Sequence, residues 1–199
     1  MEKLKSSFRN MSLVLVAVAV ITGALLAFMN HITEEPIRIQ ADKVLSDGIK
    51  DVMCNKNVVV DSSDSIVIDN NKRQELFVVY RILGNNGDNI GVAIESSVMG
   101  FGGELKVLIG FDEKAKILGY TILQSSETPG LGTKADKWFA EGGKGNIIGH
   151  DMSDGKPLSV KKDGGTVDAI TASTITTKAF LKAVNQAYAV YAKYQKRKD

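Results

Sequence analysis

Residues that hold metals or cross-link a chain are scarce in this sequence. It has one cysteine, Cys54, which excludes a disulfide within the chain, and no Cys-x-x-Cys pair, which argues against an iron–sulfur or structural zinc site. Its two histidines, His31 and His150, are far apart in the sequence. We therefore expect no metal centre built from cysteine or histidine.

The sequence also lacks a strong excess of charge and the glycine motifs of nucleotide enzymes. Its 25 basic and 23 acidic residues leave a net charge of +2, which comes from the first 33 residues, so the body offers no footprint for nucleic acid. No Gly-x-x-x-x-Gly-Lys-Ser/Thr and no Gly-x-Ser-x-Gly occurs. The Gly100-Phe101-Gly102-Gly103 run precedes a predicted strand rather than a helix, which argues against a dinucleotide fingerprint.

A long apolar run lies near the N-terminus. Residues 10–33 contain no Asp, Glu, Lys or Arg, and a helix needs about 20 apolar residues to cross a bilayer. Basic residues precede the run and two glutamates follow it. The positive-inside rule then predicts a cytoplasmic tail over residues 1–9 and places the body of the protein outside the cytoplasm.

A cleaved signal peptide is the alternative explanation of this run. The run is long for a signal peptide, and Leu25-Leu26-Ala27 is a poor small-x-small cleavage site. We therefore predict an uncleaved transmembrane helix over residues 10–33.

An amphipathic pattern follows the apolar run. Apolar residues recur at helical spacing from Ile37 to Met53, Thr33 is a candidate N-cap, and Pro36 comes early enough to be tolerated. The sequence predicts a second, juxtamembrane helix within residues 34–55.

The middle of the chain has the composition of a β-sheet. Short runs rich in β-branched residues predict strands, and turn-forming residues at 85–88 and 112–114 predict two hairpins. The predicted strands are residues 58–60, 66–68, 75–82, 90–96, 104–111 and 116–124, with 157–160 as a possible edge strand.

A tight loop follows the last of these hairpins. Pro129-Gly130-Leu131-Gly132 forms it, and such a loop can place backbone N–H groups against a flat ligand. Trp138 and Phe139 come next on a short helical pattern, where core packing is favoured over a ligand wall.

The clearest helix is predicted over residues 175–198. Apolar residues at three- and four-residue spacing form one face of it from Ala179 to Tyr194. Tyr188, Tyr191 and Tyr194 could form a stripe for stacking against a ring, but packing against the sheet is the favoured interpretation.

An acid and a cluster of hydroxyls stand just before this helix. Thr171, Ser173, Thr174 and Thr176 lie among small residues, and Asp168 lies three positions before the first of them. Hydroxyls at a helix start ordinarily cap the helix. They also leave room for a phosphate group, which the free N–H groups and the dipole of the helix attract.

Residues 168–174 resemble the flavinylation motif of FMN-binding domains: an acid, two variable residues, a hydroxyl, Gly, Ala and a final hydroxyl. Matched in order, Asp168 is the acid, Thr171 the first hydroxyl and Thr174 the residue that this family joins to the phosphate of FMN. Ala172 replaces the usual Gly, which requires an ordinary φ there, and Ser173 replaces the usual Ala and adds a rival acceptor.

Two further segments resemble one branch of this family. The run Glu127-Thr128-Pro129-Gly130-Leu131-Gly132 and the Gly-aromatic-Gly-Gly turn at residues 100–103 are similar to signatures of the G subunit of Rnf complexes and of the related C subunit of sodium-pumping NADH:quinone oxidoreductase. Three motifs in this order extend the resemblance over nearly the whole chain, and the short chain favours the Rnf subunit.

The resemblance implies an α+β fold, with a single N-terminal transmembrane helix and a β-rich FMN-binding domain over residues 56–199 that is closed by the C-terminal helix. It implies FMN bound covalently through a phosphoester and attached by a separate flavin transferase. The implied cofactor-binding residues are Thr174 as the attachment point, Thr171, Ser173 and Asp168 from the same motif, and Glu127, Thr128, Gly130 and Leu131 along the ring.

The implied function is electron transport in a complex of the bacterial cytoplasmic membrane that moves electrons between ferredoxin and NAD and translocates ions. The domain would lie on the periplasmic, extracytoplasmic side among neighbouring membrane subunits, and the protein alone would have no turnover with NADH. Two alternatives stay open: the C-type subunit of the quinone oxidoreductase, and a cofactor-free anchored binding or scaffold protein.

Overall fold

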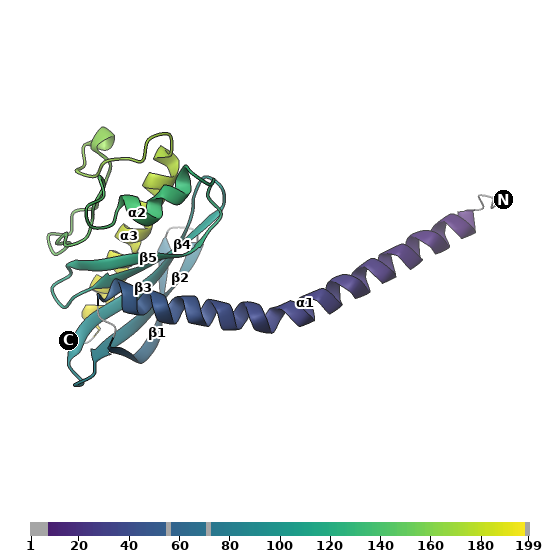
Figure 1. Cartoon of the computed structure of the whole chain (residues 1–199), viewed down its shortest axis with the longest axis horizontal. Helices are drawn as coiled ribbons and strands as arrows, with labels where there is room; N and C mark the ends of the chain where they lie inside the picture. The colour runs from purple at the N-terminus through teal and green to yellow at the C-terminus, as the bar shows by residue number, and fades with distance from the viewer. Residues whose placement is uncertain (1–7, 55–56, 71–72, 198–199) are drawn as a thin grey trace. The chain divides into compact units, whose positions relative to one another are not determined.

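The computed structural model describes residues 8–54, 57–70 and 73–197 (Figure 1). The chain divides between Lys43 and Val44 into two compact units, each described by itself below. The predicted cytoplasmic tail falls almost wholly outside the described residues, because only Phe8 and Arg9 of it are included.

Helix α1 (Phe8–Val52) runs without a break through both of the helices predicted from the sequence. Of the described helices it alone is long and apolar enough to cross a membrane, and its apolar window is fully exposed. Residues 10–33 of it span about 36 Å, enough for a hydrocarbon core of about 30 Å. The predicted N-cap at Thr33 is wrong: its hydroxyl donates back to the carbonyl of Met29 at 2.8 Å, a bond that a threonine makes inside a helix.

The second unit is built on one antiparallel sheet whose strands follow one another in chain order. These strands are β1 (Val58–Asn70), β2 (Arg73–Gly84), β3 (Asn89–Met99), β4 (Glu104–Phe111) and β5 (Ile117–Ser125). Both predicted hairpins are confirmed. The two predicted strands at 58–60 and 66–68 are one strand, since the polar residues between them also pair with β2, with a register shift between Val60 and Ser62.

Helix α3 (Thr174–Gln195) packs on one face of the sheet. Tyr191 and Tyr194 on its apolar face are buried in the core, and Phe139 is buried in the same core, so core packing is confirmed for these rings over a stacking stripe. The helix ends at Gln195, three residues before its predicted end at Lys198, which lies outside the described residues.

The last turns of α1 pack on the opposite face of the sheet. Ile49 and Val52 form a separate cluster with Leu108 of β4, whose neighbours Val107 and Ile109 belong to the cluster beneath α3. A Cβ on Gly110 or Gly119 would come within 2.6 or 2.7 Å of the Val52 carbonyl oxygen. The sheet therefore needs glycine at both positions to let the end of the helix approach.

Irregular segments connect β5 to α3, interrupted by the short helix α2 (Ala135–Trp138) and two 3₁₀ turns, η1 (Gly132–Lys134) and η2 (Lys161–Asp163). The predicted edge strand at 157–160 is wrong. Val160 makes only an isolated parallel bridge to Val167, because the N–H and carbonyl of Leu158 bond instead to the side chain of Asn185 on α3.

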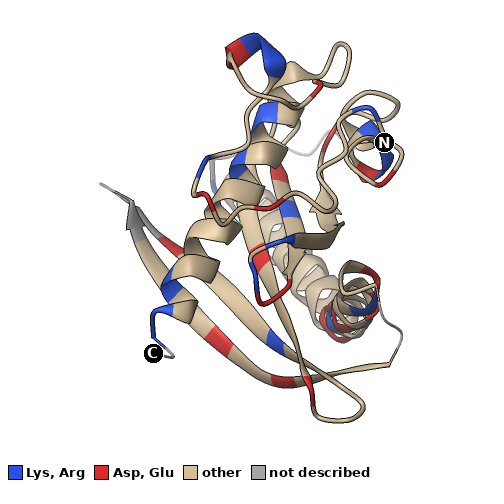
Figure 2. Cartoon of the chain, turned by 90° about the vertical axis from the view of Figure 1, so that its left-hand side faces the viewer, with Lys and Arg blue, Asp and Glu red and all other residues tan. Residues whose placement is uncertain are grey.

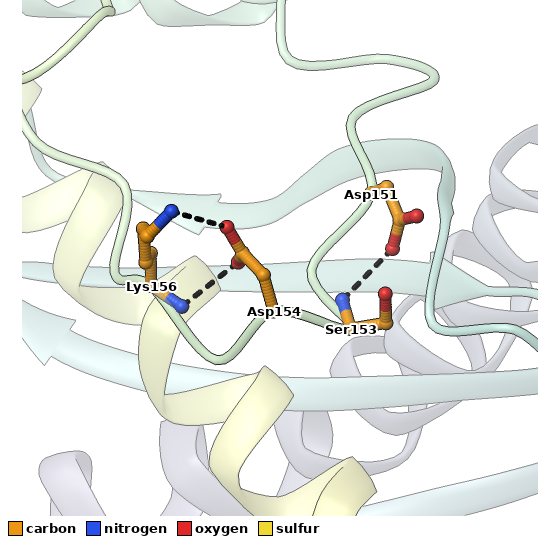
Figure 3. Close-up of polar contacts among 4 residues, drawn as sticks. All are labelled: Asp151, Ser153, Asp154 and Lys156. Atoms are coloured by element: carbon orange, nitrogen blue, oxygen red, sulfur yellow. Dashed lines mark hydrogen bonds and ion pairs between the residues drawn. The ribbon is translucent and has the colours of Figure 1, made fainter.

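Short side-chain bonds fold this connection locally (Figure 3). Ser153 N–H donates to Asp151 at 2.8 Å, and Lys156 N–H donates to Asp154 at 2.9 Å. Bonds from the Ser153 hydroxyl and backbone hold the pKa of Asp151 below its usual value, and the bond from the Lys156 N–H does the same for the pKa of Asp154. In the view of Figure 2, acidic and basic residues are interspersed along the ribbon.

Candidate functional site

Three segments singled out in the sequence meet at one end of the sheet. The turn at residues 100–103 joins β3 to β4, and the loop at residues 126–132 leaves the end of β5, which pairs with the start of β4. The first turn of α3 lies against this loop. Antiparallel pairing of β3, β4 and β5 is what brings the turn and the loop to the same edge.

The side chain of Glu127 connects these three segments. It is only 6% exposed. Its Oε1 accepts from the backbone N–H of Phe101 at 2.7 Å, and its Oε2 accepts from the hydroxyl of Thr176 at 2.8 Å. Both carboxylate oxygens are therefore occupied by donors from the protein itself.

Glycines make room for this carboxylate. A Cβ on Gly100 would lie 2.0 Å from Oε1 of Glu127, and a Cβ on Gly132 would lie 2.6 Å from Oε2. One glycine of each motif is thus explained by close approach to one buried side chain. In the same turn, Gly102 and Gly103 instead approach Ser126.

The loop after Glu127 is fixed by its own bonds and by the sheet. The N–H of Gly130 donates to the hydroxyl of Thr133 at 3.0 Å, and Gly130 adopts a left-handed φ of 74°. Tyr120 of β5 donates its hydroxyl to the carbonyl of Ala135 at 2.7 Å, and burial raises the pKa of this tyrosine well above its usual value. Thr128, Gly130 and Leu131 are exposed at the surface of this loop.

Side chains from neighbouring segments fix the flavinylation-like motif near its start and near its end. Asp168 forms an ion pair of 2.7 Å with Lys161, and its carbonyl accepts from the indole N–H of Trp138 at 2.8 Å. Thr177 is fully buried; its hydroxyl accepts from the N–H of Ile170 and donates to the carbonyl of Ser173, both at 3.0 Å. The loop between Asp168 and α3 is therefore closed on itself by a side chain of the helix it precedes.

Ala172 has a left-handed backbone, with φ of 62°. The expectation of an ordinary φ at this position is wrong. A turn closed by the bond from Ser173 N–H to the carbonyl of Ile170, together with the two bonds of Thr177, holds Ala172 in this conformation. The position thus has the backbone for which a glycine is suited, although this sequence places alanine there.

Replacing Ala172 by glycine is expected to stabilise the protein. The left-handed conformation costs an alanine about 1–2 kcal/mol, while the greater backbone freedom of an unfolded glycine costs about 0.5–1 kcal/mol. We expect Ala172→Gly to raise the free energy of unfolding by up to about 1 kcal/mol, measured by urea denaturation. Ala169→Gly is the control: Ala169 has no positive φ, so glycine should lower stability there. A loss of stability in both variants would contradict the strain at Ala172.

The hydroxyls of the motif differ in accessibility. Ser173, Thr176 and Thr177 are buried, with 8%, 2% and 0% of their surfaces exposed, whereas Thr174 is half-buried and Thr171 is exposed. Ser173 stands at the N-cap of α3 but makes no side-chain capping bond. The plain helix-cap interpretation of Ser173 is therefore wrong. The Ser173 side chain therefore accepts no hydrogen bond from the N–H groups of the first turn of α3.

Exposed apolar side chains lie on all three segments of the site. Phe101, Leu131 and Ile175 are all exposed. The backbone N–H of Phe101 bonds to Glu127. Leu131 is followed by Gly132, which closely approaches Glu127, and Ile175 is followed by Thr176, which bonds to Glu127. A helix start with free N–H groups suits a phosphate, and exposed apolar side chains suit a flat ring. The residues present therefore fit a cofactor that has a phosphate at one end and an aromatic ring system at the other.

Sequence reasoning did not assign Thr176, Thr177 or Ile175 to the site. Thr177 lies just past the family motif, and Thr176 is separated from its partner Glu127 by 49 residues. The only available signal was the density of hydroxyls at the helix start. The number of hydroxyls at the helix start does not indicate which of them are accessible and which are buried.

The family model for the FMN-binding domain matches residues 100–189, which include all three segments of this site. The chain is also similar to curated proteins named as the G subunit of an ion-translocating oxidoreductase complex. It is 34% identical to the one from Vibrio parahaemolyticus over 90% of this chain and 87% of that protein, 32% identical to the one from Vibrio vulnificus over the same shares, and 30% identical to one from Aliivibrio fischeri over 96% and 93%. From the family match and this near full-length similarity we conclude that the chain belongs to the family of G subunits of ion-translocating oxidoreductase complexes and has that family's FMN-binding domain.

Proposed function

We propose that this protein is the flavin-carrying G subunit of an Rnf-type complex, which moves electrons between ferredoxin and NAD and translocates ions. FMN supplies the electron-transfer chemistry, and the chain supplies its position and surroundings. The protein acts together with the other membrane subunits of the complex. It has no turnover by itself.

The observation that carries this proposal is the accessibility of Thr174 at the start of α3. Of the hydroxyls from Ser173 to Thr177, it is the one whose side chain is not buried. We propose that its oxygen forms a phosphoester with FMN, with the first N–H groups of the helix facing the phosphate. Thr171 is the remaining accessible hydroxyl of the motif and the next candidate acceptor.

Attachment requires a flavin transferase that uses FAD. In a balanced reaction the hydroxyl of Thr174 loses its proton, its oxygen bonds to the FMN phosphorus of FAD, and AMP leaves. The test is expression of the full chain with and without a transferase, followed by a denaturing gel under ultraviolet light. A fluorescent band only with the transferase supports covalent attachment, and a dark band in both would refute it.

We further propose that α1 anchors the protein in the cytoplasmic membrane, with the FMN-binding domain on the extracytoplasmic side. The similarity to a subunit of an ion-translocating complex and the apolar residues 10–33 support the anchor. The basic residues before this run and the acidic ones after it support the orientation.

The single cysteine gives a test of this orientation. Cys54 is exposed and lies after the end of α1. We expect a membrane-impermeant maleimide to label the wild type in intact spheroplasts, and Cys54→Ser to remain unlabelled. Adding Ser6→Cys to Cys54→Ser moves the thiol to the cytoplasmic tail, where labelling should need lysis. Labelling of Cys54 only after lysis would reverse the proposed orientation.

The two alternatives from the sequence are less well supported. The relatives named above are G subunits, which favours the Rnf-type complex over the quinone oxidoreductase. A cofactor-free scaffold would not explain the match to the FMN-binding domain.

A further inference from the structure

Glu127 is a buried carboxylate, and such a group normally needs hydrogen bonds or an opposite charge to offset the loss of its hydration. Burial of an ionised group is costly unless it is hydrogen-bonded or paired. None of the ion pairs among the described residues includes Glu127. Its compensation is instead two hydrogen bonds, from the N–H of Phe101 and from the hydroxyl of Thr176.

These two donors belong to different parts of the proposed flavin site. Phe101 lies in the turn between β3 and β4, and Thr176 lies two residues after Thr174 on α3. Glu127 itself lies in the 126–132 loop, which also carries Leu131. Each oxygen already accepts a hydrogen bond from the protein, and the backbones of two glycines pack on the carboxylate. Glu127 was predicted to line the ring, but its geometry suits a different role.

We propose that Glu127 is a positioning residue: it holds the turn at 100–103, the loop at 126–132 and the first turn of α3 in one arrangement. In this arrangement the exposed side chains of Phe101, Leu131 and Ile175 are available to a flat ring beside the attachment hydroxyl, and these three residues are here called the ring seat. This inference rests on the proposed function, because the ligand of the ring seat is the flavin ring tethered to Thr174. The ring seat limits the motion of that ring, which the phosphoester alone would leave free to swing.

The hydrogen bonds can be removed separately from the charge. Thr176→Val removes the donor to Oε2 at almost constant volume, and Thr176→Ser restores it. Glu127→Ala removes both bonds. Glu127→Gln keeps both contacts without the charge, since its oxygen accepts from Phe101 and its amide donates to Thr176, whose hydroxyl can also accept.

The first measurement needs no flavin. Hydrogen exchange, followed by mass spectrometry on the full chain in detergent, reports on the N–H of Phe101 through peptides covering Met99–Leu105. A bond to a charged acceptor is strong, so Glu127→Ala should speed exchange at Phe101 about ten- to hundredfold. Glu127→Gln keeps a weaker, neutral acceptor, so its exchange should lie between that of the wild type and that of Glu127→Ala. Equal exchange in Glu127→Ala and wild type would overturn the proposal.

The second measurement is the fluorescence anisotropy decay of the flavin on the full chain. In the wild type we expect the flavin to rotate with the protein. In Thr176→Val and Glu127→Ala a fast component should appear while the covalent flavin is retained, and Thr176→Ser should abolish that component. Val190→Ala, at a buried position near the other end of α3, controls for lost stability and should show no fast component.

The outcomes separate this inference from the proposed function. A wild type without covalent flavin would refute the attachment, whereas the exchange experiment would still test the role of Glu127. Covalent flavin with the same anisotropy decay in all variants would refute the positioning role and leave the attachment intact. A fast component in Val190→Ala as large as in Thr176→Val would also overturn it, because lost stability would then explain the effect.

Discussion

Thr174→Ala is expected to abolish covalent flavin completely. The substitution removes the oxygen that forms the phosphoester, and the methyl group of alanine cannot act as a nucleophile in its place. Thr174 is half-buried, and the hydrogen bonds of the neighbouring Thr176 and Thr177 do not involve it, so the variant should fold normally. The measurement is flavin fluorescence of the denatured chain after expression with a transferase, which should fall to background.

Three matched variants locate the acceptor. Thr174→Ser keeps a hydroxyl at the same place and should retain the flavin, and Ser173→Ala and Thr171→Ala should retain it because neither removes the proposed acceptor. Flavin that persists in Thr174→Ala but disappears in Thr171→Ala would move the attachment to Thr171. Loss in Ser173→Ala alone would mean that the buried serine is the acceptor after all.

Phe180→Ala is expected to cause the largest loss of stability. Phe180 is fully buried on α3, stacks on Phe139 with ring centroids 4.2 Å apart, and meets Tyr120 edge-on at 4.8 Å. Truncating a buried phenylalanine costs about 3–5 kcal/mol, a large part of the roughly 5–15 kcal/mol that stabilises a typical domain. Urea denaturation followed by tryptophan fluorescence measures this loss through Trp138.

Phe101→Ala provides the matched comparison, since Phe101 is 67% exposed. Removing an exposed ring should change the free energy of unfolding by no more than about 0.5 kcal/mol. The three rings of Phe180, Phe139 and Tyr120 join α3 to the segment that follows the 126–132 loop. A similar stability loss for Phe101→Ala and Phe180→Ala would contradict this core.

Local patterns predicted most of the secondary structure, and the errors have both long-range and local causes. Both hairpins and the C-terminal helix follow from alternation, turn residues and helical spacing. The strand predicted at 157–160 failed because Asn185, 27 residues after Leu158, takes the backbone bonds that a strand would have used. The break predicted at Thr33 failed for a local reason, because its hydroxyl bonds within the helix instead of capping it.

The site was predictable to the level of its segments but not of its contacts. The motif resemblance singled out Thr174 and the loop at Glu127, and the structure brings these segments together through Thr176. The motif resemblance could not reveal that both oxygens of Glu127 accept hydrogen bonds, because the partners Phe101 and Thr176 are 26 and 49 residues away in the sequence. Nor could it reveal the left-handed φ of Ala172, which the bonds of Thr177 help to hold in place.

The most direct test of covalent flavin on this protein is the mass of one peptide from the wild type purified from its own cells. Trypsin cleavage after Lys162 and Lys178 releases residues 163–178, which contain the whole hydroxyl cluster. We expect this peptide to be yellow and heavier by one FMN less one water, with fragment ions that place the added mass on Thr174. A colourless peptide of unmodified mass would contradict the proposal that this protein carries electrons on a tethered flavin.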